Sequence, residues 1–426
     1  MAAFFGGSAL LALCDCNNFF VSCERLLRPD LKEKPVVVLS ANDGCIISRS
    51  NEVKDMGIAM GEAYFRVEGL LRKKGVAVFS GNHRLYRDVS RRVMAVLSAF
   101  TDKMEVYSID EAFLNLAIAA IEDPLAYAEE IRSTVMRRVG VPLSVGVAPS
   151  KTLAKLAAEH AKPASVGVFR IDAGNAGEIL ERTPVADLWG VGRRGARQLA
   201  AWGVRTASDL VRCDPAWVAK RMTVRGLMMQ LELRGHPCFP LASAPSPPKS
   251  LQASHSFGEP LRALEDLEAA VVEHALRAGR ALRRHGRAAG RMRVYLLRGY
   301  ISREHRFVSG ERAFPSPALC DQDLMGLALE LLRGIFEPGC FYTKAGVVLE
   351  GLCDANFRQT GLFDPLDPER RRRAALERLA PVVDGINRAL GGNAVFPASL
   401  AVREKRWRCK SDMRSTGDLP ILSGDK

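Results

Sequence analysis

The sequence lacks the long hydrophobic segments and the cysteine patterns that would place the protein in a membrane or outside the cell. No apolar run reaches the roughly 18 residues that a membrane-spanning helix needs. The apolar start, Met1 to Leu13, has no basic residues ahead of it and so does not match a secretory signal peptide. The ten cysteines form no Cys-x-x-Cys pair and no Cys/His cluster, which argues against a zinc site or a disulfide framework. We therefore expect a cytoplasmic protein with no membrane partner.

The sequence does have a clear excess of positive charge. Its 61 Lys and Arg residues outnumber 48 Asp and Glu, giving a formal net charge of +13. Such an excess indicates a polyanionic partner, either a nucleic acid or an acidic membrane surface. The charge is concentrated between residues 277 and 312, where eleven arginines face only two acids, Glu304 and Glu311. A chain of 426 residues predicts about two to four domains.

The order of predicted elements in the first half of the chain is β–α–β–β–α–β, the ferredoxin-like plan. The expected elements are a buried strand at 8–15, a helix at 83–100, strands at 104–110 and 112–116, a helix at 123–139 and a strand at 143–148. Residues 20–80 form an insertion that contains a strand at 35–40 and a short helix at 51–56. Residues 176–235 predict short helices punctuated by glycines.

The second half repeats this order after a linker rich in proline, serine and alanine at 240–250. The expected elements are a strand at 252–257, a helix at 261–286, strands at 291–298 and 306–314, a helix at 321–336 and a strand at 345–350. A further amphipathic helix is expected at about 370–390. The predicted fold class is therefore a multidomain α+β protein with two βαββαβ units.

Three carboxylates are the best candidates for chemistry. Asp15 ends the first strand, and Asp110 and Glu111 lie between the two central strands. In a βαββαβ sheet the strands that bear them are neighbours. Clustered carboxylates repel one another unless cations lie between them, and hard oxygen ligands select Mg²⁺. Two such ions about 4 Å apart can activate a 3′-hydroxyl and stabilise a departing pyrophosphate. From the residues alone, a turn aspartate and a solvated hairpin tip explain the same acids equally well.

Four ordered blocks of sequence resemble the Y-family translesion DNA polymerases, and in particular their UmuC branch. The blocks are LCDCNNFFVSCE (13–24), KPVVVLSANDGCIISRSNEVKDMG (34–57), VYSIDEAF (106–113) and VGVAPSKTLAKLAAEHAKP (145–163). The resemblance covers essentially the whole chain and implies a right-hand polymerase. The implied parts are a palm at 1–19 and 81–175, small fingers at 20–80, a helical thumb at 176–239, the linker at 240–250, a βαββαβ little finger at 251–352 and a tail at 353–426.

The resemblance also implies roles for individual residues at the reaction centre. Asp15 and Asp110 would bridge two Mg²⁺ ions, Glu111 would hold the catalytic ion, and the backbone carbonyl of Cys16 would complete the nucleotide-side ion. Phe20 matches the steric gate, whose ring occupies the space that a ribose 2′-hydroxyl needs. For the Phe19-Phe20 pair taken alone, ordinary core packing is the alternative.

Contacts with the incoming dNTP follow from the same alignment. The implied residues are Asn18, Phe19, Phe20, Ser48, Lys54 and Lys162. A hydroxyl donor and two ammonium groups suit a triphosphate. A solvated surface charge is the alternative for Lys54, and a partner of a helix dipole is the alternative for Lys162. The sequence has Asn51 and Lys54 where other branches have an aromatic residue and an arginine, and His83 where relatives often have tyrosine.

DNA contacts are expected in two places. The stretch Gly190-Val191-Gly192-Arg193-Arg194-Gly195 resembles the hairpin of a helix-hairpin-helix module, in which glycines let the backbone approach a phosphate. A plain helix–helix turn is the alternative. In the second unit, strand alternation places Arg291, Arg293 and Tyr295 on one face, which would contact DNA backbones without reading sequence. A charged solvent-exposed face is the alternative there.

Two stretches near the end of the chain imply protein partners. Gln359-Thr360-Gly361-Leu362-Phe363 resembles the peptide by which bacterial polymerases bind the sliding clamp, with Gln359, Leu362 and Phe363 as its contacts. Residues 407–420 (WRCKSDMRSTGDLP) resemble the C-terminus of the UmuC branch, which implies a UmuD-type partner.

The expected function is error-prone, template-directed DNA synthesis past lesions during the SOS response, in the bacterial cytoplasm at the nucleoid. Its substrates would be primer-template DNA and dNTPs. Three alternatives remain open. They are a DinB-like polymerase that needs no UmuD-type partner, a catalytically silent scaffold that binds DNA and clamp, and a two-metal nuclease.

Overall fold

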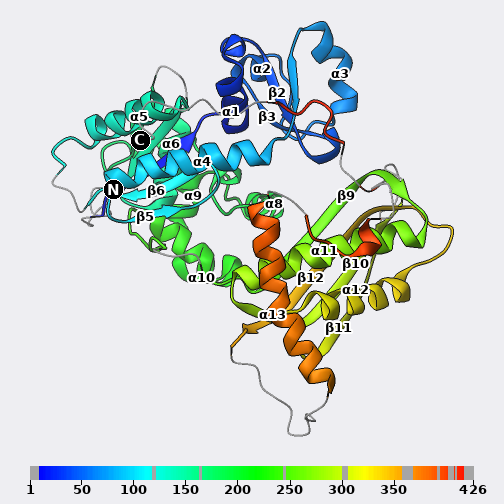
Figure 1. Cartoon of the computed structure of the whole chain (residues 1–426). Helices are drawn as coiled ribbons and strands as arrows, with labels where there is room; N and C mark the ends of the chain where they lie inside the picture. The colour runs from blue at the N-terminus through cyan, green and yellow to red at the C-terminus, as the bar shows by residue number, and fades with distance from the viewer. Residues whose placement is uncertain are drawn as a thin grey trace. The chain divides into compact units, whose positions relative to one another are not determined.

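The computed structural model describes residues 9–117, 121–162, 166–242, 246–299, 306–356, 368–390, 394–401, 407 and 410–416. The chain divides into two compact units (Figure 1). Unit 1 comprises residues 1–245 together with 413–426, and unit 2 comprises residues 246–412. The division falls within the proline-rich stretch 240–250. Within the ranges described, no helix combines the length and apolarity needed to cross a membrane.

The main sheet of unit 1 has five strands in the order β5-β6-β1-β7-β8. They are β1 (Leu11–Cys16), β5 (Met104–Val106), β6 (Glu111–Asn115), β7 (Leu143–Ala148) and β8 (Val168–Arg170). The predicted β–α–β–β–α–β order is confirmed, and the first and third strands of that order, β1 and β6, are antiparallel neighbours. The additional strand β8 pairs parallel to β7.

Helices cover both faces of this sheet. Helices α4 (His83–Leu97) and α5 (Pro124–Val139) share one core with Ala12 and Cys14 of β1. Helix α6 (Lys151–Ala161) packs on the other face, in a core that includes Leu13 and Phe113. Gly146 of β7 allows α6 to approach closely, because a Cβ atom at this position would lie 2.1 Å from the amide nitrogen of Ala158. This close packing places the polar side of α6 beside the ends of β1 and β6.

Local sequence explains where these helices begin and end. Asp123 accepts hydrogen bonds from the first turn of α5, Pro124 occupies the first helical position, and Gly140 ends the helix at a φ of 78°. Ser150 caps α6 by accepting a hydrogen bond from the Leu153 amide. The boundaries of α5 and α6 are therefore encoded in a few capping residues.

The insertion at 20–80 forms a separate three-stranded sheet, called the small sheet here, with the order β3-β2-β4. Its strands are β2 (Val36–Leu39), β3 (Ile46–Arg49) and β4 (Ala77–Ser80), and its helices are α1 (Phe19–Leu27), α2 (Asn51–Asp55) and α3 (Tyr64–Lys73). The prediction of one strand and one short helix was incomplete. Strands β3 and β4 have only four residues each, which is too short for an alternating pattern to stand out.

Residues 176–233 are helical and share the α6 core. The helices are α7 (Ala176–Arg182), α8 (Arg193–Ala201), α9 (Ala207–Arg212) and α10 (Pro215–Leu233). Helix α10 is interrupted at Thr223, where φ is 64°. The buried carboxylate of Glu232 accepts hydrogen bonds from the amides of Thr152, at 2.8 Å, and Cys238, at 2.7 Å. This carboxylate ties the end of α10 to the first turn of α6.

Unit 2 is a four-stranded antiparallel sheet with helices on one face. Its elements are β9 (Leu251–Leu261), α11 (Leu264–Arg284), β10 (Arg287–Arg298), β11 (Arg306–Ala318), α12 (Asp321–Ile335), β12 (Tyr342–Asp354) and α13 (Pro368–Ala389). The predicted element order is confirmed. The strand order, β11-β10-β12-β9, differs from that of the main sheet, because the last strand lies between the first and the second. Short 3₁₀ turns occupy Pro29–Leu31, Ala41–Asp43, Ser98–Phe100, Val185–Asp187 and Ala398–Leu400.

Candidate active site

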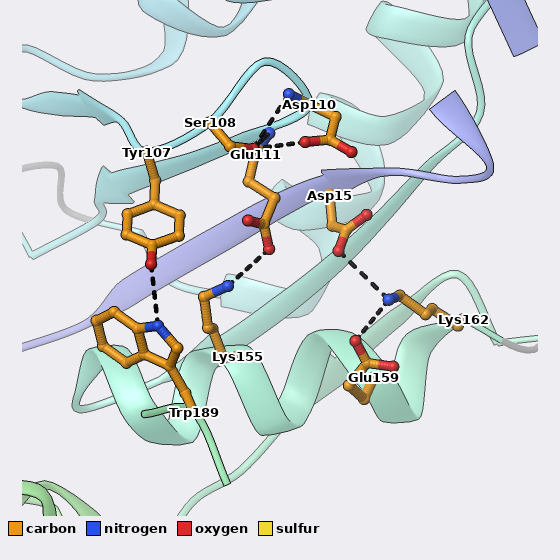
Figure 2. Close-up of polar contacts among 9 residues, drawn as sticks. All are labelled: Asp15, Tyr107, Ser108, Asp110, Glu111, Lys155, Glu159, Lys162 and Trp189. Carbon is orange, nitrogen blue, oxygen red and sulfur yellow. Dashed lines mark hydrogen bonds and ion pairs between the residues drawn. The ribbon is translucent and has the colours of Figure 1, made fainter. Parts of the chain in front are cut away.

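Strand pairing brings the three predicted acids together. Asp15 of β1 lies directly opposite Glu111 of β6 in the antiparallel register, and the amide of Cys16 donates to the carbonyl of Asp110 at 2.9 Å. Ser108 shapes the turn before β6, since its Oγ accepts hydrogen bonds from the amides of Asp110 and Glu111 at 3.3 and 3.1 Å. Its hydroxyl also donates to the Asp110 carboxylate (Figure 2). A short turn thus holds two acids beside the third.

Helix α6 supplies the positive charge at this cluster. Lys155 Nζ lies 2.8 Å from Glu111 Oε1, and Lys162 Nζ lies 3.4 Å from Asp15 Oδ2 and close to Glu159 (Figure 2). The side chains of Asp15 and Glu111 are only 14% and 17% exposed. Positions 155 and 162 are two turns apart on one face of a helix, so a single element reaches both acids.

The electrostatics of the cluster show a shortage of positive charge. Burial raises the pKa of Asp15 to about 6; Lys162 opposes this shift, whereas Glu111 and Asp110 add to it. Burial also acts to lower the pKa of Lys162, but the charges of Asp15 and Glu159 outweigh it and raise the pKa. An additional cation among these carboxylates would therefore be bound favourably.

The donor set fits a hard divalent cation. In the part of the chain that the structure describes, no three His, Cys, Asp or Glu side chains converge as a ready-made metal cluster. Lysines engage Glu111 and Asp15, and the Ser108 hydroxyl engages Asp110. Carboxylate and backbone carbonyl oxygens, such as those of Asp15 and Cys16, are ligands that suit Mg²⁺. The Cys14 and Cys16 thiols lie in the core that β1 shares with α4 and α5, and burial raises the pKa of both.

An aromatic pair encloses Lys155, and sequence reasoning missed all three of these residues. The ammonium group lies 4.6 Å from the ring centre of Tyr107 and 5.6 Å from that of Trp189. Trp189 Nε1 donates to the Tyr107 hydroxyl at 3.0 Å (Figure 2). A cavity of about 570 Å³, within the size range of ligand pockets, is lined by Trp189, Lys155, Glu111 and Asp15. The spacing of Lys155 from Lys162 was the one available signal in the sequence.

The predicted gate residue lies in an aromatic cluster. The Phe20 ring stacks on Tyr86 with 4.5 Å between ring centres, and the His83 ring meets it edge-on at 6.0 Å. Phe19 is more deeply buried, because its side chain lies within the core of the main sheet and Phe20 packs against the edge of that core. Phe19 can therefore contact a nucleotide only through its backbone.

The other predicted nucleotide contacts lie around the start of α1. Asn18 begins this helix with a left-handed backbone, and its side chain donates to Asn51 Oδ1, which also accepts from Lys54 Nζ. Burial lowers the pKa of Lys54, and the charges of Lys162 and Arg49 lower it further. Ser48 is buried, and its hydroxyl accepts a hydrogen bond from the Val21 amide at 3.4 Å.

The predicted DNA contacts differ in how their charge is compensated. Gly190 has a φ of 93°, and Gly192 precedes α8, which begins with the exposed Arg193 and Arg194. In unit 2, Arg291 and Arg293 do lie on the sheet face opposite the helices, since Met292 and Val294 between them enter the core.

Acids on neighbouring strands reduce the charge of that face in unit 2. Glu311 lies 3.5 Å from Arg291 and 3.2 Å from Arg293, and Glu350 lies 2.9 Å from Arg293. These acids partly compensate the two arginines, and the contact of this face with DNA stays a prediction. The predicted clamp contacts Gln359, Leu362 and Phe363 lie outside the described residues.

The fold defines the class of protein. It matches a Y-family DNA polymerase chimera of Dbh and Dpo4 with a TM-score of 0.67 at 21% identity, over 80% of this chain and 99% of that chain. It also matches an insertion ternary complex of Dbh DNA polymerase with a TM-score of 0.54 at 21% identity, over 80% of this chain and 98% of that one. The chain therefore has the right-hand fold of the Y-family polymerases.

The sequence then defines the family. Residues 14–159 match the impB/mucB/samB family, and residues 248–362 match the C-terminal domain of that family. The chain is 36% identical to the protein UmuC of Salmonella typhimurium over 95% of this chain and 97% of that protein. Its identity to the protein ImpB of Salmonella typhimurium is 34%, over 95% and 96% of the two chains. DNA polymerase IV of Moorella thermoacetica is 29% identical, over 87% and 92%. The chain belongs to the impB/mucB/samB family, the UmuC branch of the Y-family polymerases.

Proposed function

We propose that this chain extends a DNA primer past damaged template bases by phosphoryl transfer at Asp15, Asp110 and Glu111. Membership of the UmuC branch makes it a DNA-directed DNA polymerase of translesion synthesis, and we assign its work to the SOS response. The observation that carries the proposed mechanism is the register of β1 and β6, which sets Asp15 opposite Glu111. Two partly buried carboxylates so close together need cations, and the reaction uses them.

The roles within the cluster are those that the family resemblance implies. Asp15 and Asp110 would each contact two Mg²⁺ ions. Glu111 would contact the catalytic ion, and the Cys16 carbonyl would contact the ion on the nucleotide side. When bound, the ions supply activation of the primer 3′-hydroxyl and charge compensation at the departing pyrophosphate. Lys155 stays next to Glu111 and orients it, and its aromatic neighbours keep the ammonium group in place.

The start of α1 and the lysines around it would hold the incoming dNTP. The free amides of the first helical turn, which includes Phe19 and Phe20, suit triphosphate oxygens, and Asn18 sets the direction of this turn. Lys54 and Lys162 add positive charge on the same side, and Ser48 would add a hydroxyl. The Phe20 ring, supported by Tyr86, would exclude a ribose 2′-hydroxyl.

The remaining parts would hold DNA and protein partners. The palm, fingers, thumb and little finger would follow the boundaries expected from the sequence, with the small sheet as the fingers. Gly190, Gly192, Arg193 and Arg194 would contact one backbone of the primer-template. Arg291 and Arg293 would contact the other through the open face of unit 2. Gln359, Leu362 and Phe363 would bind the sliding clamp, and the tail would bind a UmuD-type partner in the bacterial cytoplasm.

Primer extension with the Asp110→Asn variant tests this function. The variant should lose extension by roughly a thousandfold, because neutralising one oxygen ligand removes charge stabilisation that the reaction needs. Its affinity for primer-template should match that of the parent protein, because the DNA contacts lie elsewhere. Template-dependent addition of dNTPs by the parent also separates a polymerase from a two-metal nuclease and from a silent scaffold. Extension by Asp110→Asn at the parent rate would show that the carboxylates are not the reaction centre.

A further inference from the structure

The last described stretch of the chain, residues 413–416, lies against the small sheet; we call it the C-terminal strap. The Met413 amide donates to Ser80 Oγ at 3.0 Å, and the Ser80 amide donates to the Met413 carbonyl at 3.1 Å. Ser80 and Arg414 form a parallel β-bridge, and the Met413 side chain packs against the core of the small sheet. Because β4 is an edge strand of this sheet, the strap extends the sheet at the end of β4.

The strap also contacts the helices that carry the aromatic cluster. Asn82 Nδ2 donates to Ser415 Oγ at 3.1 Å, while Asn82 Oδ1 caps α4 by accepting from the Leu85 amide. Burial raises the pKa of Glu24 on α1, and the nearby hydroxyls of Tyr86 and Ser415 act in the opposite direction. Ser415 is therefore hydrogen-bonded to the cap of α4 and lies near the Glu24 carboxylate of α1.

Two residues of α4, the helix that begins beside Ser415, contact the Phe20 ring. Tyr86, whose hydroxyl donates to Glu24 at 2.6 Å, is the residue on which the Phe20 ring stacks. His83, the edge-on neighbour of Phe20, has its pKa lowered by burial and by the charges of Arg87 and Arg414. The strap thus bonds to the end of β4 and to the cap of α4, the helix whose His83 and Tyr86 contact Phe20.

We propose that the C-terminal strap positions Phe20 for sugar selection, with Ser415 as the positioning residue. The strap holds the first turn of α4 against α1, and this contact keeps the Tyr86 and His83 rings where they support the Phe20 ring. The inference rests on the proposed gate role of Phe20. It gives the end of the chain a role in choosing deoxynucleotides that is separate from any protein partner of the tail.

The direct test compares two single substitutions in the full chain. Ser415→Ala removes the hydroxyl that accepts the hydrogen bond of the Asn82 side chain, whereas Thr416→Ala makes the same kind of change at the next, exposed residue. The measurement is the ratio of single-nucleotide incorporation efficiency for a dNTP to that for the matching rNTP. Ser415→Ala should lower this ratio roughly threefold to tenfold, the effect of losing one hydrogen bond in a partly buried site. Thr416→Ala should leave it unchanged. If Ser415→Ala shows the same dNTP-to-rNTP ratio as the parent protein, the proposal is overturned.

Two further measurements separate the strap from the gate itself. Phe20→Ala should lower the same ratio far more than Ser415→Ala; an unchanged ratio in Phe20→Ala would refute the gate, and with it the proposed sugar selection. Amide hydrogen exchange at residues 80–86 tests the strap independently of activity. The full chain with Ser415→Ala should exchange these amides faster than the full chain with Thr416→Ala. Equal protection in the two variants would show that the strap does not hold α4.

Discussion

Units 1 and 2 use the same order of strands and helices to produce opposite charge arrangements. In unit 1 the first and third strands of the order are neighbours, so Asp15 faces Glu111, and two lysines of α6 compensate the acids. In unit 2 the last strand lies between the first and second, so Glu350 of β12 reaches Arg293 of β10. Element order alone therefore does not determine which side chains meet. The strand order decides which charged side chains become neighbours.

The two charge arrangements also differ in burial, which decides what each can do. The side chains of the Glu111–Lys155 ion pair are largely buried, whereas the Arg291 and Glu311 side chains are half exposed. Buried charges have large effects on one another, and exposed charges are screened by solvent and salt. The first arrangement suits chemistry on one bound group, and the second suits contacts with a long polyanion whose position varies.

The pH dependence of stability should have opposite signs in the two units, and this is the largest effect that we expect. In the metal-free protein, burial raises the pKa of Asp15 from 3.8 to about 6. The protonated Asp15 carboxyl contributes to the free energy of unfolding, and this contribution is complete below about pH 4 and is lost as the pH rises through 6. Burial lowers the pKa of His274 from 6.5 to about 4, so its contribution is present above pH 6.5 and lost as the pH falls through 4.

Urea unfolding of Asp15→Asn and His274→Phe in a chelator, at several pH values, checks both signs. A shift of two pKa units corresponds to about 3 kcal/mol at most. Relative to the parent, Asp15→Asn should gain stability as the pH rises from 4 to 7. His274→Phe should gain stability relative to the parent as the pH falls from 7 to 4. Difference curves that are flat with pH, or that have the same sign, would break the comparison.

Removing one cation should cost more in unit 1 than in unit 2. Lys155→Met leaves Glu111 as a largely buried, unpaired carboxylate, and we expect a loss of about 1–3 kcal/mol in a chelator. Arg293→Met removes a more exposed guanidinium and should cost less than about 1 kcal/mol. Thermal unfolding measures both losses. Mg²⁺ should stabilise Lys155→Met more than the parent protein, because Glu111 then lacks its own cation. Equal losses in the two variants would contradict the difference in burial.

The smallest expected effect concerns DNA affinity. Glu350→Gln removes an acid that compensates Arg293 on the open face of unit 2, whereas Glu330→Gln makes the same charge change on α12, beside Arg312. Glu350→Gln should tighten binding of primer-template about twofold to fivefold at low salt. It should also increase the number of counterions released on binding by up to about one, which makes the affinity fall more steeply with salt. Glu330→Gln should have a smaller effect. Fluorescence anisotropy at several salt concentrations measures both. Identical behaviour of the two variants would remove the open face from the DNA-binding surface.

Much of the fold followed from sequence patterns, but side-chain neighbours across long distances did not. Helices α5 and α6 were predictable from their caps and apolar faces. The neighbouring positions of Asp15 and Asp110 were expected from the ferredoxin-like plan and the family resemblance, because the same element order gives another strand order in unit 2. The short strands β3 and β4 were missed because four residues give no reliable period. The pairing of Arg293 with Glu350 was unpredictable because it depends on the position of β12 in the sheet.

Residues from distant parts of the sequence complete the candidate site. Trp189 reaches Tyr107 over 82 positions, and Ser415 reaches Asn82 over 333, without any periodic signal in the sequence. Only the folded chain shows such contacts. The roles of Phe20, Ser48, Lys54 and Lys162 came from the family resemblance and remain predictions. The clamp contacts at Gln359, Leu362 and Phe363 likewise await a test.

The most direct test of the central claim is the rate of a single dNTP addition on primer-template at saturating DNA, measured for Glu111→Gln and for Arg293→Gln. The proposed chemistry belongs to unit 1, and the open face of unit 2 contributes only to DNA binding. We therefore predict that Glu111→Gln slows the addition by roughly a hundredfold to a thousandfold, because one charged oxygen ligand is lost. Arg293→Gln should leave this rate within about twofold of the parent and weaken DNA binding instead. A parent-like rate in Glu111→Gln, or an equal loss of rate in Arg293→Gln, would contradict the account.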